Sequence, residues 1–346
     1  MSREIPRERI RSLPKAELHV HLDGSLRPET MLELAGPLGI ELPASEPEAL
    51  AAAMRASDSK DLTQYLEKFA TTLSLMQEPE AMERMAFELV EDSAAENVRY
   101  LEVRYSPILH TEEGMSLETA VEAPLRGLAA AAEAFGVRTG LIICGMRHMD
   151  SGATLELAEL AVAFQDRGVV AFDLAGAEAG NPPTKHQAAC QLAADNNLAV
   201  TLHAGEAAGA ESIAQAIHRC HARRIGHGTR LQEDPALEAF VNDFRIPLEV
   251  CLTSNVQTRV ATSVAQHPFR RYFDAGLVVT LNTDNRLVSG TTLTEEYWLA
   301  HRELGLSWDE LVEVSLLGFQ AAFLPYEAKV RILEEVEEEI LGLEKG

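Results

Sequence analysis

The chain of 346 residues contains little cysteine and no long apolar run. Its cysteines are far apart in the sequence, which excludes a zinc knuckle or a Cys-x-x-Cys redox motif. Cys144 and Cys251 lie in apolar stretches and are expected to be thiols of the core, and Cys190 and Cys220 have no close partner in the sequence either. No stretch approaches the roughly 20 apolar residues that a membrane-spanning helix needs. A transition metal would therefore be held mainly by histidine and carboxylate.

Basic residues are also scarce. The 30 Lys and Arg residues stand against 54 Asp and Glu residues, which gives a formal net charge of −24. Such a surface repels phosphate backbones and anionic lipids, so neither a nucleic acid nor a membrane is expected as a partner, and a small neutral molecule is the more natural substrate. The amino-terminal segment MSREIPRERIRSLPK is too charged for the apolar region of a secretory signal, and we expect a cytoplasmic protein.

What the sequence does contain is a regular series of short apolar runs that alternate with helical patterns. The runs are mostly continuous in Val, Ile and Leu, as in parallel strands that are covered on both faces. Eight such alternations predict the α/β class and a (β/α)8 TIM-type barrel, with residues 1–346 forming a single domain. The expected strands are Glu17–Val20, Tyr100–Arg104, Arg138–Cys144, Val169–Leu174, Ala199–Leu202, Arg224–Ile225, Pro247–Leu252 and Leu277–Leu281.

The interval after the first expected strand is much longer than the others and predicts a helical insertion at roughly residues 36–97. Loops that follow barrel strands build the active-site end, so this insertion is well placed to roof a pocket, with Leu62 and Phe69 contacting the substrate. The alternative is a packing helix without ligand contact. Further helices are expected after residue 290. The insertion carries an amphipathic stripe at helical spacing, made of Leu62, Tyr65, Leu66, Phe69 and Leu73.

Histidines and acidic residues lie where four of the expected strands end. In a strand, residues two apart point the same way, so His19 and His21 both face the barrel mouth, where two neutral imidazoles can bind a metal. One such pair is weak support, but matching polar residues at several strand ends of one barrel predict a catalytic metal centre. The other three strand ends read His203-Ala204-Gly205-Glu206, Gly226-His227-Gly228 and Asn282-Thr283-Asp284-Asn285.

The remaining histidines are expected to have no role in this centre. The HxxH pair of His218 and His221 lies in an Arg-rich helical stretch before the sixth strand, at the opposite end of the barrel, and is interpreted as a solvated face. The same interpretation applies to His110, His148, His186, His267 and His301, which have no matching partners.

In combination, these motifs resemble the adenosine deaminase family of the amidohydrolase superfamily. The matching segments cover most of the chain: LPKAELHVHLDGSL (13–26), DLTQYLEKF (61–69), YLEVRYSP (100–107), FDLAGAEAG (172–180), TLHAGE (201–206), RIGHG (224–228) and TLNTDN (280–285). The resemblance implies the following roles: His19, His21, His203 and Asp284 bind one Zn²⁺ ion, Glu206, His227 and Asp284 are catalytic, Gly176 contacts the purine, and His21 and Asp23 lie near the ribose.

The implied reaction is the hydrolytic deamination of adenosine, and of 2'-deoxyadenosine, to inosine and ammonia. A site of three histidines and one carboxylate leaves a position for water, whose pKa the metal lowers to about 7. Attack at C6 of the purine requires protonation at N1, so Glu206 must carry a proton, which burial favours. His227 would orient the water, and Asp284 would take its proton.

A single metal is favoured over two. Related two-metal amidohydrolases often bridge their metals with a carboxylated lysine at a strand end. This chain has six lysines, and none lies at an expected strand end; the fourth strand ends in Asp173-Leu174-Ala175-Gly176. We therefore expect one zinc ion per chain.

Other activities remain alternatives. Adenine deaminase and aminodeoxyfutalosine deaminase are related activities, although the segment EVRYSP (102–107) and Asp23 favour a nucleoside. A non-deaminating amidohydrolase acting on an ester or amide is less compatible, because a proton donor for N1 at Glu206 would have no purpose there. An inactive relative is disfavoured because the metal-binding and proton-transfer residues are all present. The sequence does not indicate the oligomeric state.

The chain departs from the family pattern directly after Asp284. Where many members have a second aspartate followed by proline, this chain has Asn285 and Arg286. The family's carboxylate faces N7 of the purine, which is an acceptor, and an asparagine NH2 group donates without first taking up a proton. We expect Asn285 to donate to N7. The alternative is that Asn285 points elsewhere and that the substitution signals a different substrate.

Overall fold

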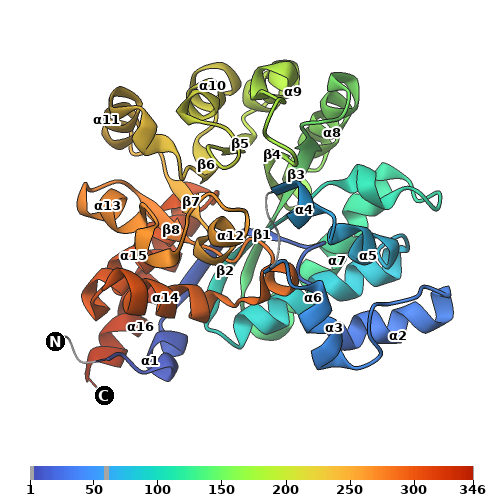
Figure 1. The fold of residues 1–346 in the computed structure, drawn as a ribbon, viewed down its shortest axis with the longest axis horizontal. Coiled ribbons are helices and arrows are strands. Elements are labelled where there is room, and N and C mark those ends of the chain that lie inside the picture. The colour runs from blue at the N-terminus through green and yellow to red at the C-terminus, as the bar shows by residue number, and fades with distance from the viewer. Residues whose placement is uncertain (1–3, 58–61, 346) are drawn as a thin grey trace.

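Eight parallel strands form a barrel at the centre of the computed structural model, which describes residues 4–57 and 62–345. Each strand pairs in parallel with the next one along the chain, and a bridge between Val20 and Asp284 brings the first and last strands together. Helices surround the strands (Figure 1), as parallel connections require. The strands are β1 Lys15–His21, β2 Val98–Tyr105, β3 Arg138–Met146, β4 Val169–Ala175, β5 Ala199–Ala204, β6 Arg224–His227, β7 Leu248–Val250 and β8 Val279–Leu281.

The predicted (β/α)8 barrel is confirmed, and the boundaries of its strands differ by a few residues. The very short sixth expected strand extends to His227 in β6. The seventh is shorter than expected because the helix α12, Leu252–Gln257, begins immediately after it. The buried carboxylate of Glu296 accepts a hydrogen bond from the backbone N–H of Thr253 in the first turn of α12, which stabilises this early helix start.

The helices between the later strands have sequence signals at their ends. Ser116 and Asp150 cap the helices that follow β2 and β3 by accepting backbone N–H groups, and Gly136 ends the first of them in a left-handed conformation. These crossover helices are α7 Leu117–Phe135, α8 Ser151–Ala163, α9 Gln187–Asp195, α10 Ala210–Cys220, α11 Pro235–Asp243 and α13 Phe269–Asp274. Short 3-10 helices are Pro107–His110, Gln165–Arg167, Pro183–His186, Leu231–Glu233 and Val264–Gln266, and Arg286–Gly290 forms a π-helical turn.

The helical insertion after β1 is present and begins earlier than predicted, at Pro28. Proline at the first helical position starts three of its helices, where the missing N–H leaves no bond unmade. Its helices are α2 Pro28–Leu38, α3 Pro47–Met54, α4 Leu62–Leu66, α5 Phe69–Ser74 and α6 Pro79–Ala94. The first residue of the matching segment 61–69 lies outside the described residues.

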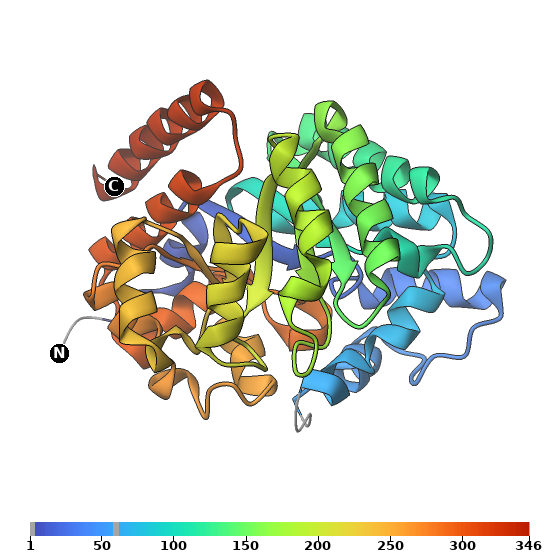
Figure 2. The same cartoon turned by 90° about the horizontal axis from the view of Figure 1, so that it is seen from above.

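The expected carboxyl-terminal helices are α14 Leu293–Leu304, α15 Trp308–Ala321 and α16 Tyr326–Lys345, and α1, Arg7–Ser12, contacts α14. In Figure 2, the dark-red α16 lies on the opposite side of the strands from the light-blue α4 and α5. Buried Arg224 donates to the carbonyl of Ala321 (2.9 Å) and stacks 3.5 Å over the ring of Phe323. The segment after α15 thus closes one end of the barrel, and α4 and α5 lie at the other.

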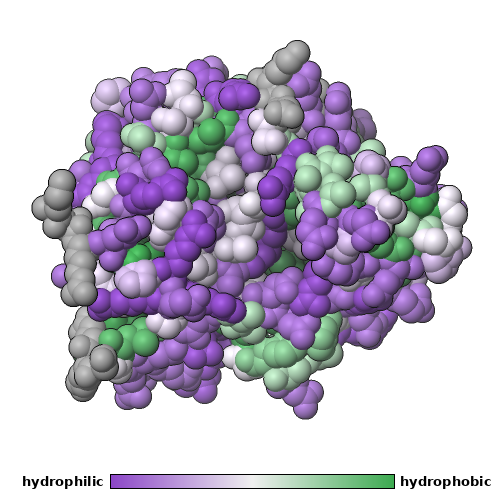
Figure 3. Space-filling model, turned by 60° about the horizontal axis from the view of Figure 1, so that its bottom comes forward, coloured by the Kyte–Doolittle hydropathy of each residue, from purple (hydrophilic) through white to green (hydrophobic). Residues whose placement is uncertain are grey.

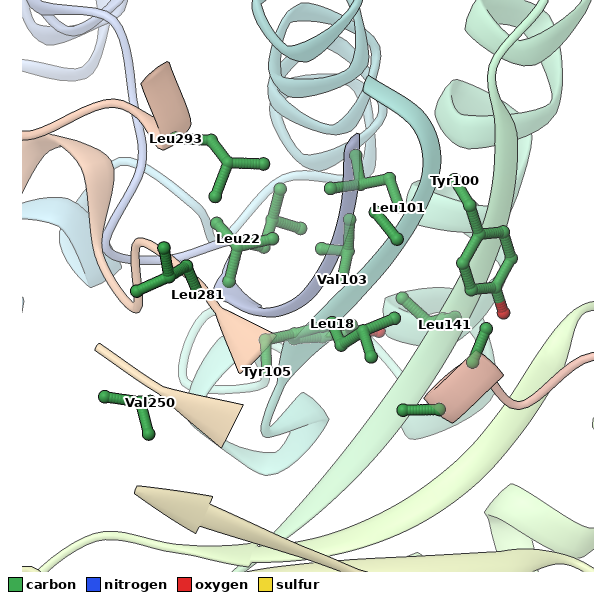
Figure 4. Packing of buried hydrophobic residues seen from close by; sticks show 14 of the residues in the cluster. Leu18, Leu22, Tyr100, Leu101, Val103, Tyr105, Leu141, Val250, Leu281 and Leu293 are labelled. Carbon is green, nitrogen blue, oxygen red and sulfur yellow. The ribbon is translucent and has the colours of Figure 1, made fainter. Parts of the chain in front are cut away.

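The core between strands and helices is densely apolar. Leu18 and Leu22 lie among Leu101 and Val103 of β2 and Leu281 of β8, all almost completely buried (Figure 4). Each fully buried side chain of this size contributes about 1.5–3 kcal/mol relative to an exposed one. This packing holds the strands rigid and therefore fixes where their polar ends lie.

The outer surface fits the acidic composition. The face in Figure 3 is mostly hydrophilic, and its hydrophobic residues form separate patches. Within residues 4–57 and 62–345, no helix combines the length and apolar character needed to cross a membrane.

Candidate active site

Four side chains with metal-binding atoms meet at the carboxyl ends of β1, β5 and β8. They are the predicted His19, His21, His203 and Asp284, whose ligand atoms all lie within 4.8 Å of one another. Nε2 of His21 is 3.1 Å from Nε2 of His203 and 3.3 Å from Oδ1 of Asp284. The structure therefore brings together the four residues that the family resemblance implied as metal ligands.

The donor atoms of this cluster fit a divalent cation. Nδ1 of His19 lies 2.9 Å from the carboxylate of Glu249, and Nδ1 of His203 lies 2.9 Å from that of Asp173. An imidazole that donates from Nδ1 carries its lone pair on Nε2, the atom free to bind a metal. Nε2 of His19 is buried and has no hydrogen-bond partner among the described residues. A metal would satisfy this atom.

Arg104 of β2 connects the two carboxylates behind the histidines. It donates to Asp173 (2.9 Å) and to Glu249 (2.7 Å). Burial opposes ionisation of Asp173, but His203 and Arg104 hold the pKa of its carboxyl well below the usual range. Against the same effect of burial, Arg104 and Arg224 hold the pKa of Glu249 low. Sequence analysis missed these three supporting residues; the only signal was a charged residue inside an otherwise apolar strand.

Two of the site residues have backbones in the left-handed region. His227 and Asp284 both have φ of 62°, which is uncommon for residues other than glycine. Hydrogen bonds hold Asp284 there, because its N–H donates to His19 (2.9 Å) and its carbonyl accepts from the N–H of His21 (2.7 Å). Strained residues of this kind concentrate at functional sites.

Glu206 and His227 face each other beside the metal-binding cluster, with Oε2 and Nε2 separated by 3.6 Å. Both side chains are buried. Burial raises the pKa of Glu206 above its usual value, although nearby His227 opposes the shift. Glu206 is thus placed to hold a proton.

Glu178 organises the loop that carries Glu206, and sequence analysis missed it. Its carboxylate accepts the backbone N–H groups of residues 205–208 at 2.6–3.0 Å and the hydroxyl of Ser212 at 2.6 Å. Bonds from several backbone donors to one carboxylate lock the loop conformation. The signal available was only its place in the segment 172–180.

A cavity of about 230 Å³ opens in front of these groups. The volume is below the range of about 300–1,000 Å³ for drug-sized ligands and suits a small molecule. Its apolar roof comes from the predicted stripe of the insertion. The residues lining it are His21, Asp23, Leu62, Tyr65, Leu66, Phe69, Leu73, Ser106, Leu109, Cys144, Met146, His148, Ala175, Gly176, His203, Glu206, His227, Asp284 and Asn285.

Asn285 reaches the cavity but already uses part of its hydrogen-bonding capacity. Its Nδ2 donates to Oη of Tyr65 (2.9 Å), which lies 2.7 Å from Oγ of Ser289. The side chain fits because residue 24 is glycine: a Cβ there would lie 1.9 Å from Oδ1 of Asn285. The adjacent Arg286 turns away and pairs with Glu17 (3.3 Å).

The remaining histidines divide differently from the expectation. His218 and His221 are exposed, as expected of a solvated face. His148 is exposed yet lines the cavity, and His267 is buried next to residues that contact His227. The others are buried with backbone partners, namely His110, His186 and His301.

Comparisons with known proteins agree with this geometry. The model of the adenosine deaminase family matches residues 14–339. The adenosine deaminase of Mycobacterium sp. (strain JLS) is 44% identical, over 97% of each chain. Among solved structures, adenine deaminase from Arthrobacter aurescens superposes with a TM-score of 0.88 at 32% identity, over 95% of this chain and 99% of that one. The N6-mAMP deaminase of Arabidopsis gives 0.85 at 34%, over 96% and 99%.

Proposed function

This chain belongs to the adenosine deaminase family, and we propose that it hydrolyses the 6-amino group of adenosine, and of 2'-deoxyadenosine, to give inosine or 2'-deoxyinosine and ammonia. The observation that carries the proposal is a buried carboxyl with a raised pKa, Glu206, facing the same small cavity as a three-histidine, one-aspartate cluster. Deamination needs both a proton donor to the ring and an activated water, and this cavity offers a place for each.

We propose that His19, His21, His203 and Asp284 hold one Zn²⁺ ion. When bound, the ion supplies Lewis acidity, which lowers the pKa of a water molecule to about 7. Ser254 donates to Oδ2 of Asp284 at 2.6 Å and so orients its carboxylate. Against the effect of burial, the neighbouring imidazoles of His19 and His21 keep the pKa of Asp284 low, so its carboxylate is ionised and can accept a proton.

Glu206 is assigned the complementary proton transfer. Its acid form donates a proton to N1 of the purine, which lets C6 become tetrahedral. His227, on the neighbouring wall of the cavity, stabilises the attacking oxygen. These three roles of Asp284, Glu206 and His227 account for the catalytic residues that the sequence indicated.

The cavity favours a nucleoside over a nucleotide. Among the described residues that line it there is neither Lys nor Arg to receive a phosphate. Buried Asp23 has one carboxylate oxygen without a partner in the described structure, and ribose hydroxyls, which are donors, suit it. Gly176, with φ of 89°, brings its backbone to the wall without a side chain, which suits close contact with a flat purine.

Ultraviolet spectroscopy with adenosine, adenine and AMP in parallel tests this proposal. We expect conversion of adenosine and little or none of the other two. Efficient conversion of adenine without adenosine would overturn the nucleoside assignment in favour of the activity known for the Arthrobacter relative. Adding aminodeoxyfutalosine to the same assay separates the remaining alternative.

Shortening the roof should weaken binding. Leu62→Ala or Phe69→Ala is expected to raise KM for adenosine by about 5–30-fold with a smaller change in kcat, because each removes roughly 1–2 kcal/mol of apolar contact. The control is Leu125→Ala on α7, which is partly buried but does not line the cavity. A lower melting temperature with unchanged kinetics in the two roof variants would support a packing role instead.

The proposed contact of Asn285 with N7 can be tested with 7-deazaadenosine. One N–H of the Asn285 amide is used by Tyr65, and we propose that the second donates to N7. The wild type should then lose about 1–3 kcal/mol in kcat/KM with the deaza analogue, and Asn285→Ala should largely remove this difference. Equal losses in both proteins would argue that Asn285 makes no such contact.

We further propose that residues 1–346 act as a single domain in the cytoplasm. The match of one family model to residues 14–339, around one barrel, supports the single domain. The cytoplasmic location remains a prediction from the sequence.

A further inference from the structure

A chain of buried hydrogen bonds leads away from the cavity behind His227. Nδ1 of His227 lies 3.1 Å from Nδ2 of Asn255, and Oδ1 of Asn255 lies 3.1 Å from Nε2 of His267. Nδ1 of His267 accepts the backbone N–H of Phe269 at 3.0 Å. His227, Asn255 and His267 expose at most 4% of their surface.

The direction of each hydrogen bond follows from the bond at the end of the chain farthest from the cavity, between Phe269 and His267. The N–H of Phe269 can only donate, so Nδ1 of His267 carries a lone pair. Burial lowers the pKa of His267 to about 3, so the ring is neutral and its proton lies on Nε2. That proton is donated to Oδ1 of Asn255, which also accepts the hydroxyl of Thr229 at 3.1 Å.

The N–H of His267 settles the orientation of the Asn255 amide. Rotating the amide by 180° would place its NH2 group against that N–H and remove the bond, whereas the hydroxyl of Thr229 can donate or accept in either orientation. The NH2 group therefore points at Nδ1 of His227, which must accept. The proton of a neutral His227 then lies on Nε2, the atom that faces Glu206.

We propose that Asn255 and His267 are positioning residues that hold His227 as the neutral tautomer with its proton on Nε2. His227 is then a hydrogen-bond donor into the cavity and not a base, because its one lone pair is turned outward to Asn255. The catalytic role of this donor rests on the proposed function. The tautomer itself follows from the hydrogen bonds.

Helix α12 positions both Asp284 and His227. Ser254 and Asn255 are adjacent in it, and the first donates to Asp284 while the second donates to His227. The cap that Glu296 makes to Thr253 holds the first turn of α12 in place. One short helix thus orients Asp284 as an acceptor and His227 as a donor.

The test replaces Asn255 with Asp, which keeps the shape but puts a carboxylate opposite Nδ1. We expect the proton of His227 to move to Nδ1, which is visible in the ring-nitrogen chemical shifts of the ¹⁵N-labelled, zinc-loaded protein. The kcat for adenosine should fall on the order of 100-fold, as for loss of one transition-state donor, with KM and zinc content little changed. Rescue of kcat is tested at His267, the next residue in the chain of hydrogen bonds. His267→Ala should lower kcat, and His267→Gln, which restores an N–H donor, should recover part of it.

His301→Gln is the matched control, because His301 is also buried and bonded through both ring nitrogens but lies outside this chain of bonds. If Asn255→Asp does not fold, His267→Ala, which removes the donor that fixes the orientation of the Asn255 amide, replaces it and should shift the same nitrogen signals. A wild-type His227 with its proton on Nδ1, or an unchanged tautomer in a folded Asn255→Asp variant, would overturn the proposal. Because the nitrogen signals do not depend on turnover, absence of adenosine deamination would count against the proposed function alone.

Discussion

Glu206→Gln should keep its metal and lose about 10²–10⁴-fold in kcat for adenosine. Glutamine has nearly the same shape as a protonated glutamate but has no proton to transfer to N1. Burial, which raises the pKa of Glu206, favours the acid form in the wild type. Steady-state ultraviolet assays give kcat, and elemental analysis of the same preparation gives the zinc content.

Glu211→Gln is the matched control, since Glu211 is an exposed glutamate on α10, a few residues along the chain. It should leave kcat unchanged. Normal turnover in Glu206→Gln would show that Glu206 is not the proton donor, whereas loss of zinc would show that the substitution acts through the metal cluster.

His203→Ala should remove both zinc and turnover, and chelation of the wild type should lower its melting temperature as well as its activity. Saturation of the folded state with an ion at 1,000 times its Kd stabilises it by about 4 kcal/mol. Tight structural binding of this kind links metal content to folding. Elemental analysis, calorimetry with and without chelator, and activity assays measure the three effects.

The buried charges explain why the effect on stability should be large. The ion pairs behind the cluster, together with Asp284, set the guanidinium groups of Arg104 and Arg224 against four carboxylates, and a divalent cation beside Asp284 would offset the excess negative charge. The carboxylates are those of Glu102, Asp173, Glu249 and Asp284. His218→Ala, in the exposed HxxH pair, is the control and should keep its zinc. Full activity in metal-free protein would contradict the metal hypothesis.

The sequence by itself determined the barrel and which polar side chains gather at its carboxyl end. Apolar runs alternating with helical patterns specify parallel strands, and parallel strands bring their carboxyl ends to one edge. His19 and His21, two residues apart in β1, must then share a direction, and His203 and Asp284 lie at the same edge. These conclusions need only the period of a strand and the direction of its neighbours. The amphipathic stripe predicted the roof of the cavity in the same way.

Only the tertiary structure decided which side chains support those residues and in which direction each hydrogen bond runs. Glu178 reaches the loop 205–208, and Asn255 links His227 to His267, across elements whose separation in sequence carries no periodic signal. The pairing of Asn285 with Tyr65 is of the same kind, since it joins the segment after β8 to the insertion over 220 positions. Such contacts depend on how rigid elements pack and on side-chain geometry, because a hydrogen bond requires a donor and an acceptor within a few tenths of an ångström of the right separation.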